Sequence, residues 1–553
     1  MNKPLFKRLL QPYTLSAISF LLALCVFAIM LYVTPFFGGG FWLQLGVFTI
    51  SLLTSFGSLS LGLLRSARIW LKLLAFAPAS LGIGTILGAT FLSYSLVRDG
   101  ASIHSFSSME DSRTGSTQIG TGDREISIGY MKLSSRAEQP ASPIVYLSGG
   151  PGGSGTVSMY AYGRYSLFQA LRSVSDVIVY DQRGTMPWAG DWMICADPWT
   201  PDWTFTPESL VRNKIERTRA CYNKYLAKGV DPAAYNTINN AEDLESLRKH
   251  LGVDKLNLWA TSYGTHLALT YMKRYPLNVD KAILHGTEGL DDTLKTPVQI
   301  QAALEKVAQL ASRDPDISAH LPDLLAAIER LLARADKGEL ILNPEPTSNS
   351  DSGAGKPLIF SKWELQFYLS EMLRTASSSL AIPAHVYAAL QGDMRGFEGW
   401  ARSMRKEQPR VALMPTYMDC ASYASAERLA LIAEQAPKTL LGDAINFSLP
   451  QLCAGIDAPV LGDDFRAPFS SDIPTLFISG DFDARTPIDN AKRAAQDFRN
   501  AHHLIIQGAG HGNDLFLSSG KILKNMLMFF RTAEVKSTMI FVKTEIKKLD
   551  LNP

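Results

Sequence analysis

The chain has 553 residues, of which 46% are hydrophobic, and its formal net charge is +2. This length allows two domains and a substantial core, and the near-neutral charge argues against a surface built for nucleic acid. The sequence contains no basic stripe and no cluster of metal ligands, and its nine histidines are scattered. We therefore expect neither a nucleic-acid partner nor a metal site.

Three long apolar runs fill the N-terminal region, at residues 14–36, 41–64 and about 69–97. Each run is long enough to cross a hydrocarbon core of roughly 30 Å, so the sequence predicts a membrane segment of three transmembrane helices over residues 1–97. A cleaved signal peptide is the alternative for the first run. That run lacks a clear small-residue cleavage site, however, and two more runs follow it at once.

Basic residues beside these runs predict the orientation of the membrane segment. They precede the first run or lie between the second and the third: Lys3, Lys7, Arg8, Arg65, Arg68 and Lys72. Because cytoplasmic loops carry an excess of Lys and Arg, everything after Val97 is expected outside the cytoplasm. The interpretation is a multi-pass protein, suited to a bacterial inner membrane, with the lipid bilayer as a partner and a periplasmic or extracellular folded domain.

A strand that enters a small-residue turn and then a helix is predicted at Leu256–Leu269, LNLWATSYGTHLAL. In a nucleophile elbow a serine occupies such a turn, where backbone N–H groups face a developing oxyanion. Ser262 is the candidate nucleophile. Gly264 allows strand and helix to approach closely, whereas Ala260 stands where glycine is usual. His266, one helical turn further on, is expected to be a buried, hydrogen-bonded side chain.

A serine hydroxyl needs a histidine that takes its proton and a carboxylate that orients the histidine. Residues 474–487 predict a buried strand followed by a polar loop with two acids, Asp481 and Asp483. Residues 504–512 predict a last short strand that ends in a glycine-rich loop carrying His511. The resulting order of serine, acid and histidine differs from the orders in the two common serine protease folds.

Ile144–Gly155, IVYLSGGPGGSG, predicts another apolar strand that opens into a loop almost free of side chains. Such a loop lets backbone N–H groups approach a substrate oxygen. The candidate oxyanion donors are the N–H of Tyr263, directly after the nucleophile, and one N–H from Gly149 or Gly150. The sequence does not decide between the two glycines.

Together these segments resemble the α/β-hydrolase family of proline iminopeptidases and tripeptidyl aminopeptidases. The matching motifs, spread over residues 143–530, are SGGPGGSG, VYDQRGT, YNTINNAEDLESLRKHLG, WATSYGTHLAL, GDFDARTP and GAGHG. The resemblance implies that Ser262 is the nucleophile, His511 the base and Asp483 the orienting acid, since the matching acid lies three residues before Thr-Pro. It implies no cofactor. The chain departs from the family at Ser148, where a histidine is common.

Buried strands alternate with helical stretches, which predicts an α/β-hydrolase fold with a mostly parallel sheet and helices on both faces. The first part of this core is expected at residues 126–290, after a polar linker at 98–125, and the second part at 473–535. Between them, at 291–472, apolar residues recur at helical spacing and predict an inserted helical cap. Residues 536–553 are expected to form a surface tail.

An exopeptidase that selects free N-termini needs a carboxylate in its pocket to hold the ammonium group. Glu288 is the first candidate, because it follows the strand AILHG at the expected carboxyl edge of the sheet, where ligands bind in such folds. Asp419, beside Cys420, is a second and poorer candidate. The alternative interpretation of Glu288 is a solvated loop acid or a helix-capping residue.

The four cysteines that follow the apolar runs are Cys195, Cys221, Cys420 and Cys453. An even number of cysteines in an oxidising compartment predicts disulfides. Four cysteines permit three pairings, of which the simplest joins the first two and the last two. Free buried thiols are the alternative.

The resulting hypothesis is a membrane-anchored serine hydrolase, an aminopeptidase that releases residues or short peptides from free N-termini through an acyl-enzyme. An esterase or amidase that acts on a small envelope metabolite would share the triad and is the first alternative. A catalytically silent hydrolase-like binding domain, motivated by Ala260 and Ser148, is an alternative of another class. Substrate identity and oligomeric state are left open.

Overall fold

A computed structural model describes residues 101–110, 124–160, 163–185, 192–196, 205–342, 358–405 and 410–551. The three predicted transmembrane runs, at 14–36, 41–64 and 69–97, lie outside these residues. Within the described ranges, no helix combines the length and the apolar character needed to span a bilayer. Residues 104–553 form one compact unit.

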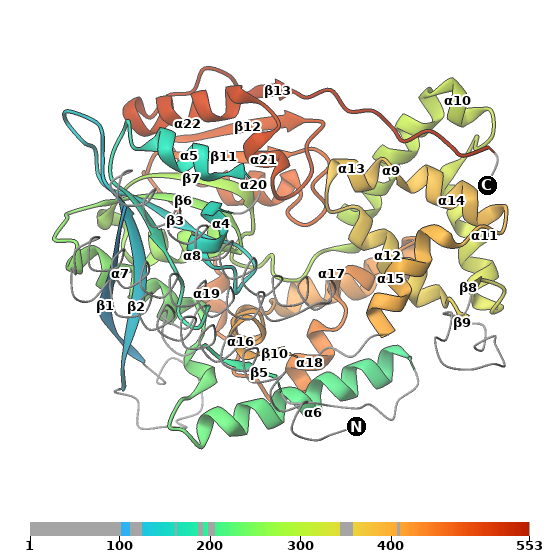
Figure 1. Cartoon of the computed structure of the whole chain (residues 1–553), viewed down its shortest axis with the longest axis horizontal. Helices are drawn as coiled ribbons and strands as arrows, with labels where there is room; N and C mark the ends of the chain where they lie inside the picture. Colours follow the sequence, from blue (N-terminus) through green and yellow to red (C-terminus); the bar gives the residue numbers. More distant parts are fainter. Residues whose placement is uncertain are drawn as a thin grey trace, which may run out of the picture. The chain divides into compact units, whose positions relative to one another are not determined.

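A nine-stranded sheet runs through the described part of this unit (Figure 1). Its strands in spatial order are β1 (Ala101–Glu110), β2 (Arg124–Leu133), β4 (Val177–Tyr180), β3 (Ile144–Leu147), β6 (Leu256–Ser262), β7 (Val279–Thr287), β11 (Thr475–Gly480), β12 (Ala501–Gln507) and β13 (Met539–Phe541). The strands from β4 to β13 pair in parallel, and β2 pairs antiparallel with β4. Parallel pairing gathers the carboxyl ends of these strands at one edge, where the predicted site loops begin.

Helices that follow the strands of this sheet are α4 (Gly155–Tyr160), α5 (Tyr165–Leu171), α7 (Thr237–His250), α8 (Tyr263–Arg274), α20 (Ile488–Ala495), α21 (Asp514–Leu517) and α22 (Gly520–Thr532). The other helices are α6 (Pro207–Leu226), α9 (Pro297–Arg313), α10 (Pro315–Ser318), α11 (Leu324–Asp336), α12 (Lys362–Met372), α13 (Ala376–Ser379), α14 (Ile382–Leu390), α15 (Arg395–Arg405), α16 (Leu413–Ser422), α17 (Ala426–Gln435), α18 (Leu449–Gly455) and α19 (Asp463–Arg466). Two short pairs of strands are β5 (Ile194–Cys195) with β10 (Val411–Ala412), and β8 (Ile341–Leu342) with β9 (Leu358–Ile359).

Alternate residues of β6 pack on opposite faces of the sheet. Leu258 and Ala260 belong to a hydrophobic cluster that includes residues of α7, α8 and α20. Trp259 points to the other face, where its ring packs against Phe168 of α5 and Phe516 of α21. The period of two along a strand therefore lets one apolar run of sequence bury both faces, as expected for a parallel sheet covered by helices.

Most of the helices between β7 and β11, within the predicted cap at 291–472, pack in one of two groups. Residues of α9 to α15 share a hydrophobic cluster that is separate from the sheet. In contrast, Met414 and Met418 of α16 and Cys453 of α18 belong to the cluster on the sheet face. Helix α16 thus packs as part of the core, although the sequence groups it with the cap.

Two segments expected to be irregular contribute edge strands. β1 lies in the predicted linker at 98–125, and β13 lies in the predicted tail at 536–553. In β13 only Ile540 is buried, so the sequence pattern is too short to predict a strand. Beyond β13 the backbone N–H of Lys547 donates a hydrogen bond to Leu380, so the C-terminal segment crosses to α13 and its neighbours (Figure 1).

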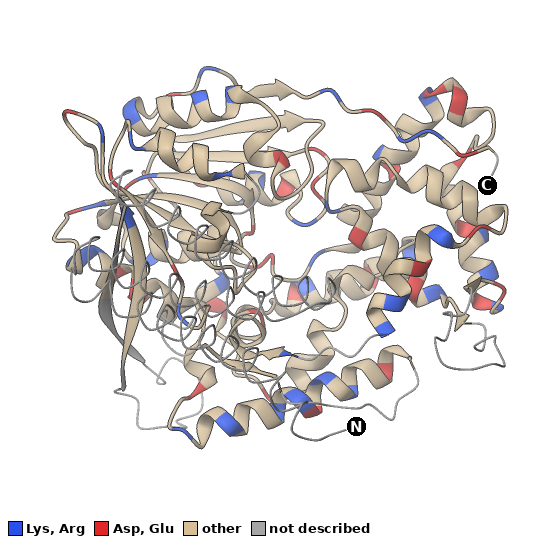
Figure 2. Ribbon diagram, in the orientation of Figure 1, with Lys and Arg blue, Asp and Glu red and all other residues tan. Residues whose placement is uncertain are grey.

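Charged residues of both signs are interspersed over the described helices, and the central strands carry few of them (Figure 2). On α6, acidic and basic side chains follow one another along the same helix. No stripe of a single sign runs over the described ribbon in this view.

Candidate active site

Ser262 is the last residue of β6 and has φ 53° and ψ −129°, a positive-φ conformation that residues other than glycine rarely adopt. Helix α8 begins at the next residue. A Cβ atom on Gly264 would clash with the carbonyl oxygen of Leu147, so glycine is needed where α8 crosses the end of β3. Ala260 packs its methyl group in the sheet-face cluster and leaves this crossing unaffected. The local geometry is that of a nucleophile elbow.

The structure brings together the three residues predicted to form a triad. His511 lies in the loop after β12, and its Nε2 atom is 3.1 Å from the Ser262 hydroxyl oxygen. Its Nδ1 atom is 2.8 Å from Oδ2 of Asp483, in the loop after β11. Asp483 and His511 are buried and Ser262 is half-buried, and this enclosure strengthens the hydrogen bonds relative to water. In this arrangement the imidazole can take the serine proton, and the carboxylate can stabilise the resulting imidazolium.

The two acids after β11 have different surroundings. Asp483 accepts hydrogen bonds from the backbone N–H groups of Arg485 and Thr486 at 2.9 and 2.8 Å. Asp481 instead forms an ion pair with Lys306 of α9 and accepts a hydrogen bond from Gly508 N–H. Only Asp483 reaches the histidine, in agreement with the choice made from the Thr-Pro spacing.

Thr486 is a site residue that the sequence analysis missed. Its hydroxyl donates to Oδ2 of Asp483 at 2.7 Å and lies 3.1 Å from Nδ1 of His511. The hydroxyl therefore fixes the same carboxylate oxygen that orients the imidazole. The available signal was the threonine of the GDFDARTP motif, three residues after the acid.

The candidate oxyanion donors lie beside the nucleophile. A Cβ atom on Gly149 would come within 2.7 Å of the Ser262 Cβ, so the loop after β3 touches the serine. Gly150 has φ +130°, a conformation that favours glycine. Tyr263 is the first residue of α8, where backbone N–H groups have no partner within the helix. Its side chain turns inward, and its hydroxyl contacts Sδ of Met418.

Glu288 follows β7, and a single hydroxyl group connects its backbone to the backbone of the candidate nucleophile. Thr265 donates to the carbonyl oxygen of Ser262 at 2.6 Å and accepts from the Glu288 N–H at 2.8 Å. The Glu288 carboxylate is buried and pairs through Oε2 with the Lys295 ammonium at 3.2 Å. The predicted ammonium ligand thus lies next to the elbow, already paired with one cation.

Asp419 of α16 is a second carboxyl group near Glu288. Burial, together with the negative charge of Glu288, holds the pKa of Asp419 well above its ordinary value. No described group donates a hydrogen bond to this carboxyl group, and part of its side chain remains accessible to solvent. The pair can therefore accept an additional cation.

Comparisons with known proteins match two parts of the chain to described families. Residues 142–351 match the family described as alpha/beta hydrolase fold, and residues 440–539 match the family described as TAP-like protein. Together with the mostly parallel sheet, these matches support an alpha/beta hydrolase fold for this chain. A putative hydrolase, YuaR, of Escherichia coli (strain K12) is 24% identical over 416 residues, which are 70% of this chain and 77% of the relative.

Further relatives cover less of the chain or show only a distant likeness. A proline iminopeptidase of Lactobacillus helveticus is 26% identical over 218 residues, 37% of this hydrolase and 55% of the relative. The solved structure of Rv0554 from Mycobacterium tuberculosis covers 78% of this chain and all of its own, at 15% identity and a TM-score of 0.34. The esterase EaEST from Exiguobacterium antarcticum covers 74% of this chain and 96% of its own, at 14% identity and a TM-score of 0.31.

In this hydrolase, a disulfide bond and the hydrogen bonds of one histidine hold helix α16 in place near the nucleophile elbow. The structure forms both simplest disulfides, Cys195–Cys221 and Cys420–Cys453, and the second joins α16 to α18 beside Asp419. His266 contacts the Ser422 hydroxyl at 3.0 Å through Nε2. Its Nδ1 lies 2.9 Å from the carbonyl oxygen of Gly289, directly after Glu288. Burial lowers the pKa of His266, so the neutral ring connects the Glu288 turn to α16, as its expected structural role requires.

The cap group of helices contacts the histidine loop directly. The His511 N–H donates to the carbonyl oxygen of Arg374, which follows α12, at 2.7 Å. Asp514 accepts hydrogen bonds from Gly510 N–H on the loop and from Ala376 N–H on α13, at 2.9 and 3.1 Å. The position of His511 therefore depends on the α12–α13 turn. Nothing in the sequence pattern indicates this contact.

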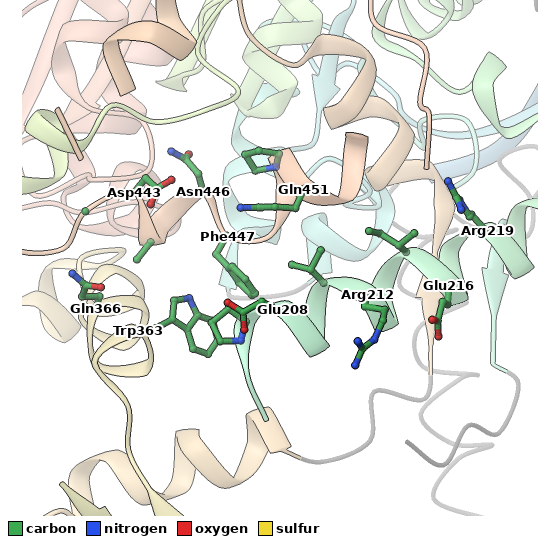
Figure 3. A pocket seen from close by; sticks show the side chains of 16 residues that line it. Glu208, Arg212, Glu216, Arg219, Trp363, Gln366, Asp443, Asn446, Phe447 and Gln451 are labelled. Carbon is green, nitrogen blue, oxygen red and sulfur yellow. The ribbon is translucent and has the colours of Figure 1, made fainter. Parts of the chain in front are cut away.

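A groove of about 640 Å³ lies between α6, α12 and the segment around α18, and none of the predicted site residues lines it (Figure 3). Trp363 and Phe447 form apolar walls, with acidic side chains nearby. Asn446, another wall residue, exchanges hydrogen bonds with both the N–H and the carbonyl group of Lys295. Because Lys295 also pairs with Glu288, this lysine connects the wall of the groove to the acid beside the nucleophile elbow. In the described residues, no group of three His, Cys, Asp or Glu could hold a metal ion.

Proposed function

We propose that this hydrolase is a serine aminopeptidase that cleaves peptides or small amides bearing a free N-terminus. The observation that supports it most strongly is the continuous line of hydrogen bonds from Asp483 through His511 to Ser262, next to an acid pair. The TAP-like match and the proline iminopeptidase relative give further support.

In the proposed reaction the Ser262 oxygen attacks the carbonyl carbon of the scissile amide while Nε2 of His511 takes the serine proton. The negative charge that forms on the carbonyl oxygen is held by the N–H of Tyr263 and an N–H of the loop after β3. The C–N bond then breaks as His511 gives its proton to the leaving amine. Water, deprotonated by the same nitrogen, hydrolyses the acyl-enzyme and restores the serine.

The acid pair would select the substrate. Lys295 already pairs with Glu288, so a substrate ammonium group would supply the second positive charge that Asp419 needs in order to ionise beside Glu288. A substrate with a blocked N-terminus would leave the second carboxylate buried near another anion, which is unfavourable. The pair thus favours free-amino substrates and disfavours acetylated ones.

We further propose that residues 1–97 anchor the enzyme in a membrane, with the catalytic domain in the periplasm or outside the cell. The three apolar runs and their flanking charges support this topology. The two disulfides support an oxidising compartment.

The direct test uses the full-length chain, its Ser262→Ala variant, and aminoacyl and tripeptidyl amides with either a free or an acetylated N-terminus. We expect turnover of the free-amino substrates only, and none by the variant. Equal turnover of acetylated substrates would favour an esterase or amidase for a small envelope metabolite. A chain that turns over neither set and does not react with a fluorophosphonate would be a silent binding domain.

A further inference from the structure

The glycine-rich loop after β3 is held from outside by two consecutive residues that follow β4. Gln182 donates from Nε2 to the carbonyl oxygen of Ser148, at the start of the loop, at 2.7 Å. Asp181 accepts from the hydroxyl groups of Ser154 and Thr156, at its end, at 2.8 and 2.7 Å. Asp181 and Gln182 are fully buried, and both hold the loop through direct hydrogen bonds.

The amide of Gln182 has only one orientation that suits its neighbours. The Tyr180 hydroxyl donates to Oδ1 of Asn240 at 2.7 Å, and Nδ2 of Asn240 donates to Oε1 of Gln182 at 2.9 Å. Burial raises the pKa of Tyr180 far above its ordinary value, so its hydroxyl keeps the proton that starts this chain. Each donor in the series therefore fixes the orientation of the next amide group. As a result, the NH₂ group of Gln182 faces the carbonyl group of Ser148.

Fixing a carbonyl group fixes the N–H on the opposite side of the same planar peptide. The bond from Gln182 to the Ser148 carbonyl therefore sets the direction of the Gly149 N–H. In the same way, the Gly153 N–H donates to the Gly149 carbonyl at 3.0 Å and sets the direction of the Gly150 N–H. Among the described groups, neither glycine N–H has a hydrogen-bond acceptor. Both N–H groups therefore remain available for a substrate oxygen, and Gly149 lies directly against Ser262.

We propose that Gln182 is a positioning residue for the oxyanion hole: oriented by Tyr180 and Asn240, it holds the loop so that its glycine N–H groups face the developing oxyanion. Because preorganised donors act only on charge that forms in the transition state, this role concerns the rate of the chemical step and not substrate affinity. The inference rests on the proposed acyl-transfer chemistry at Ser262.

The test compares Gln182→Met, which keeps the side-chain length but cannot donate, with a matched control, Asn257→Leu. Asn257 is equally buried and donates to the Ser142 carbonyl at 2.8 Å, a bond of the same kind just before β3 instead of after it. The measurement is inactivation of the full-length chain by a fluorophosphonate, whose phosphoryl oxygen occupies the oxyanion hole. Its saturation kinetics separate the inhibitor affinity KI from the rate constant kinact.

We expect Gln182→Met to lower kinact about 10- to 100-fold with KI unchanged, which is somewhat less than the loss of one oxyanion donor. Tyr180→Phe removes only the first donor of the chain and should lower kinact several-fold, also without an effect on KI. If Gln182→Met does not fold, the test is made with Tyr180→Phe. Asn257→Leu should lower thermal stability but keep the wild-type kinact.

A wild-type kinact in Gln182→Met, or in Tyr180→Phe if only that variant folds, would overturn this inference alone. An equal loss in Asn257→Leu would do the same, because it would show a general structural effect. A wild-type chain that is not labelled at Ser262 would instead overturn the proposed function and the inference with it.

Discussion

The two acidic parts of the active site differ in how well their carboxyl groups are hydrogen-bonded. Asp483 accepts four hydrogen bonds, two from backbone N–H groups and one each from Thr486 and His511. Asp419 receives none from the described residues, and its pKa is raised by burial and by the charge of Glu288. Both acids lie near the same candidate nucleophile, yet only Asp483 has hydrogen-bond donors, among the described residues, for both of its carboxylate oxygens.

In the proposed reaction, this difference would distinguish an acid that orients the histidine from an acid that binds substrate. A carboxylate with all its acceptor sites occupied is rigid and holds the imidazole in one orientation. A carboxyl group that lacks partners is unfavourable in the empty enzyme, and an incoming cation can remove that cost. We infer that the triad is preorganised and that the acid pair is completed by the substrate ammonium group.

The largest expected effect is on the triad acid. Asp483→Asn should lower kcat about 10⁴-fold, because the amide no longer holds the histidine in the required tautomer. The matched control is Asp481→Asn, two residues earlier, which loses only an ion pair with Lys306 and should change kcat by a few-fold at most. Steady-state kinetics on one aminoacyl amide measure both. Similar losses in the two variants would contradict the assignment.

Glu288→Gln is expected to lower kcat/KM for free-amino substrates about 100-fold, because it removes one partner of a buried charge interaction. The rise in KM should account for most of the loss. The acetylated substrates serve as an internal control, and Glu208→Gln in the groove is a matched surface variant that should behave as wild type. An unchanged kcat/KM for free-amino substrates in Glu288→Gln would remove this residue from the binding site.

The two disulfides allow a smaller effect, on the kinetics with free-amino substrates, to be separated from an effect on stability. Their cysteines are 26 and 33 residues apart, so replacing either pair by alanines should cost about 3–4 kcal/mol of unfolding free energy. Only the pair Cys420→Ala with Cys453→Ala should also lower kcat/KM for free-amino substrates, by several-fold, because Asp419 adjoins Cys420. Denaturant unfolding and kinetics on the folded fraction check this. Equal kinetic losses from both pairs would argue against a role of α16 in binding.

The smallest expected effect is the pH dependence of stability at Asp419. Below the ordinary carboxyl pKa of 3.8 both the folded and the unfolded chain are protonated here, so Asp419→Asn should be neutral. As the pH rises toward the raised folded pKa, the folded state binds more protons and the wild type loses stability. Asp419→Asn should therefore be more stable than wild type at pH 8, with a difference that disappears at low pH. A difference of opposite sign would mean that Asp419 has a cation partner in the empty enzyme.

Much of the chemistry was predictable because it depends on local sequence. The elbow at Ser262, the acid before Thr-Pro and the glycine-rich loop each need particular residues in a short segment, and the structure brings them together. The parallel sheet was predictable for the same reason, since its strands are continuous apolar runs. Cysteine count and spacing also led to the observed pairs.

The features that were not predictable depend on contacts between distant segments. Arg374 supports His511 through a backbone carbonyl group, which any residue supplies, so no side-chain pattern reveals it. Asp419 lies near Glu288 only because α16 packs on the sheet face, and a helical periodicity does not say which partner a helix packs against. The strand β13 has a single buried residue, Ile540, and is stabilised mainly by pairing with β12.

The most direct test is intact and peptide mass spectrometry of the full-length chain after brief mixing with an activated aminoacyl ester, free or acetylated at its N-terminus. For such esters deacylation is expected to be slow enough that the acyl-enzyme accumulates. We expect an acyl group on the peptide containing Ser262 with the free-amino ester and little or none with the acetylated ester. An adduct on another residue, or equal acylation by both esters, would contradict it.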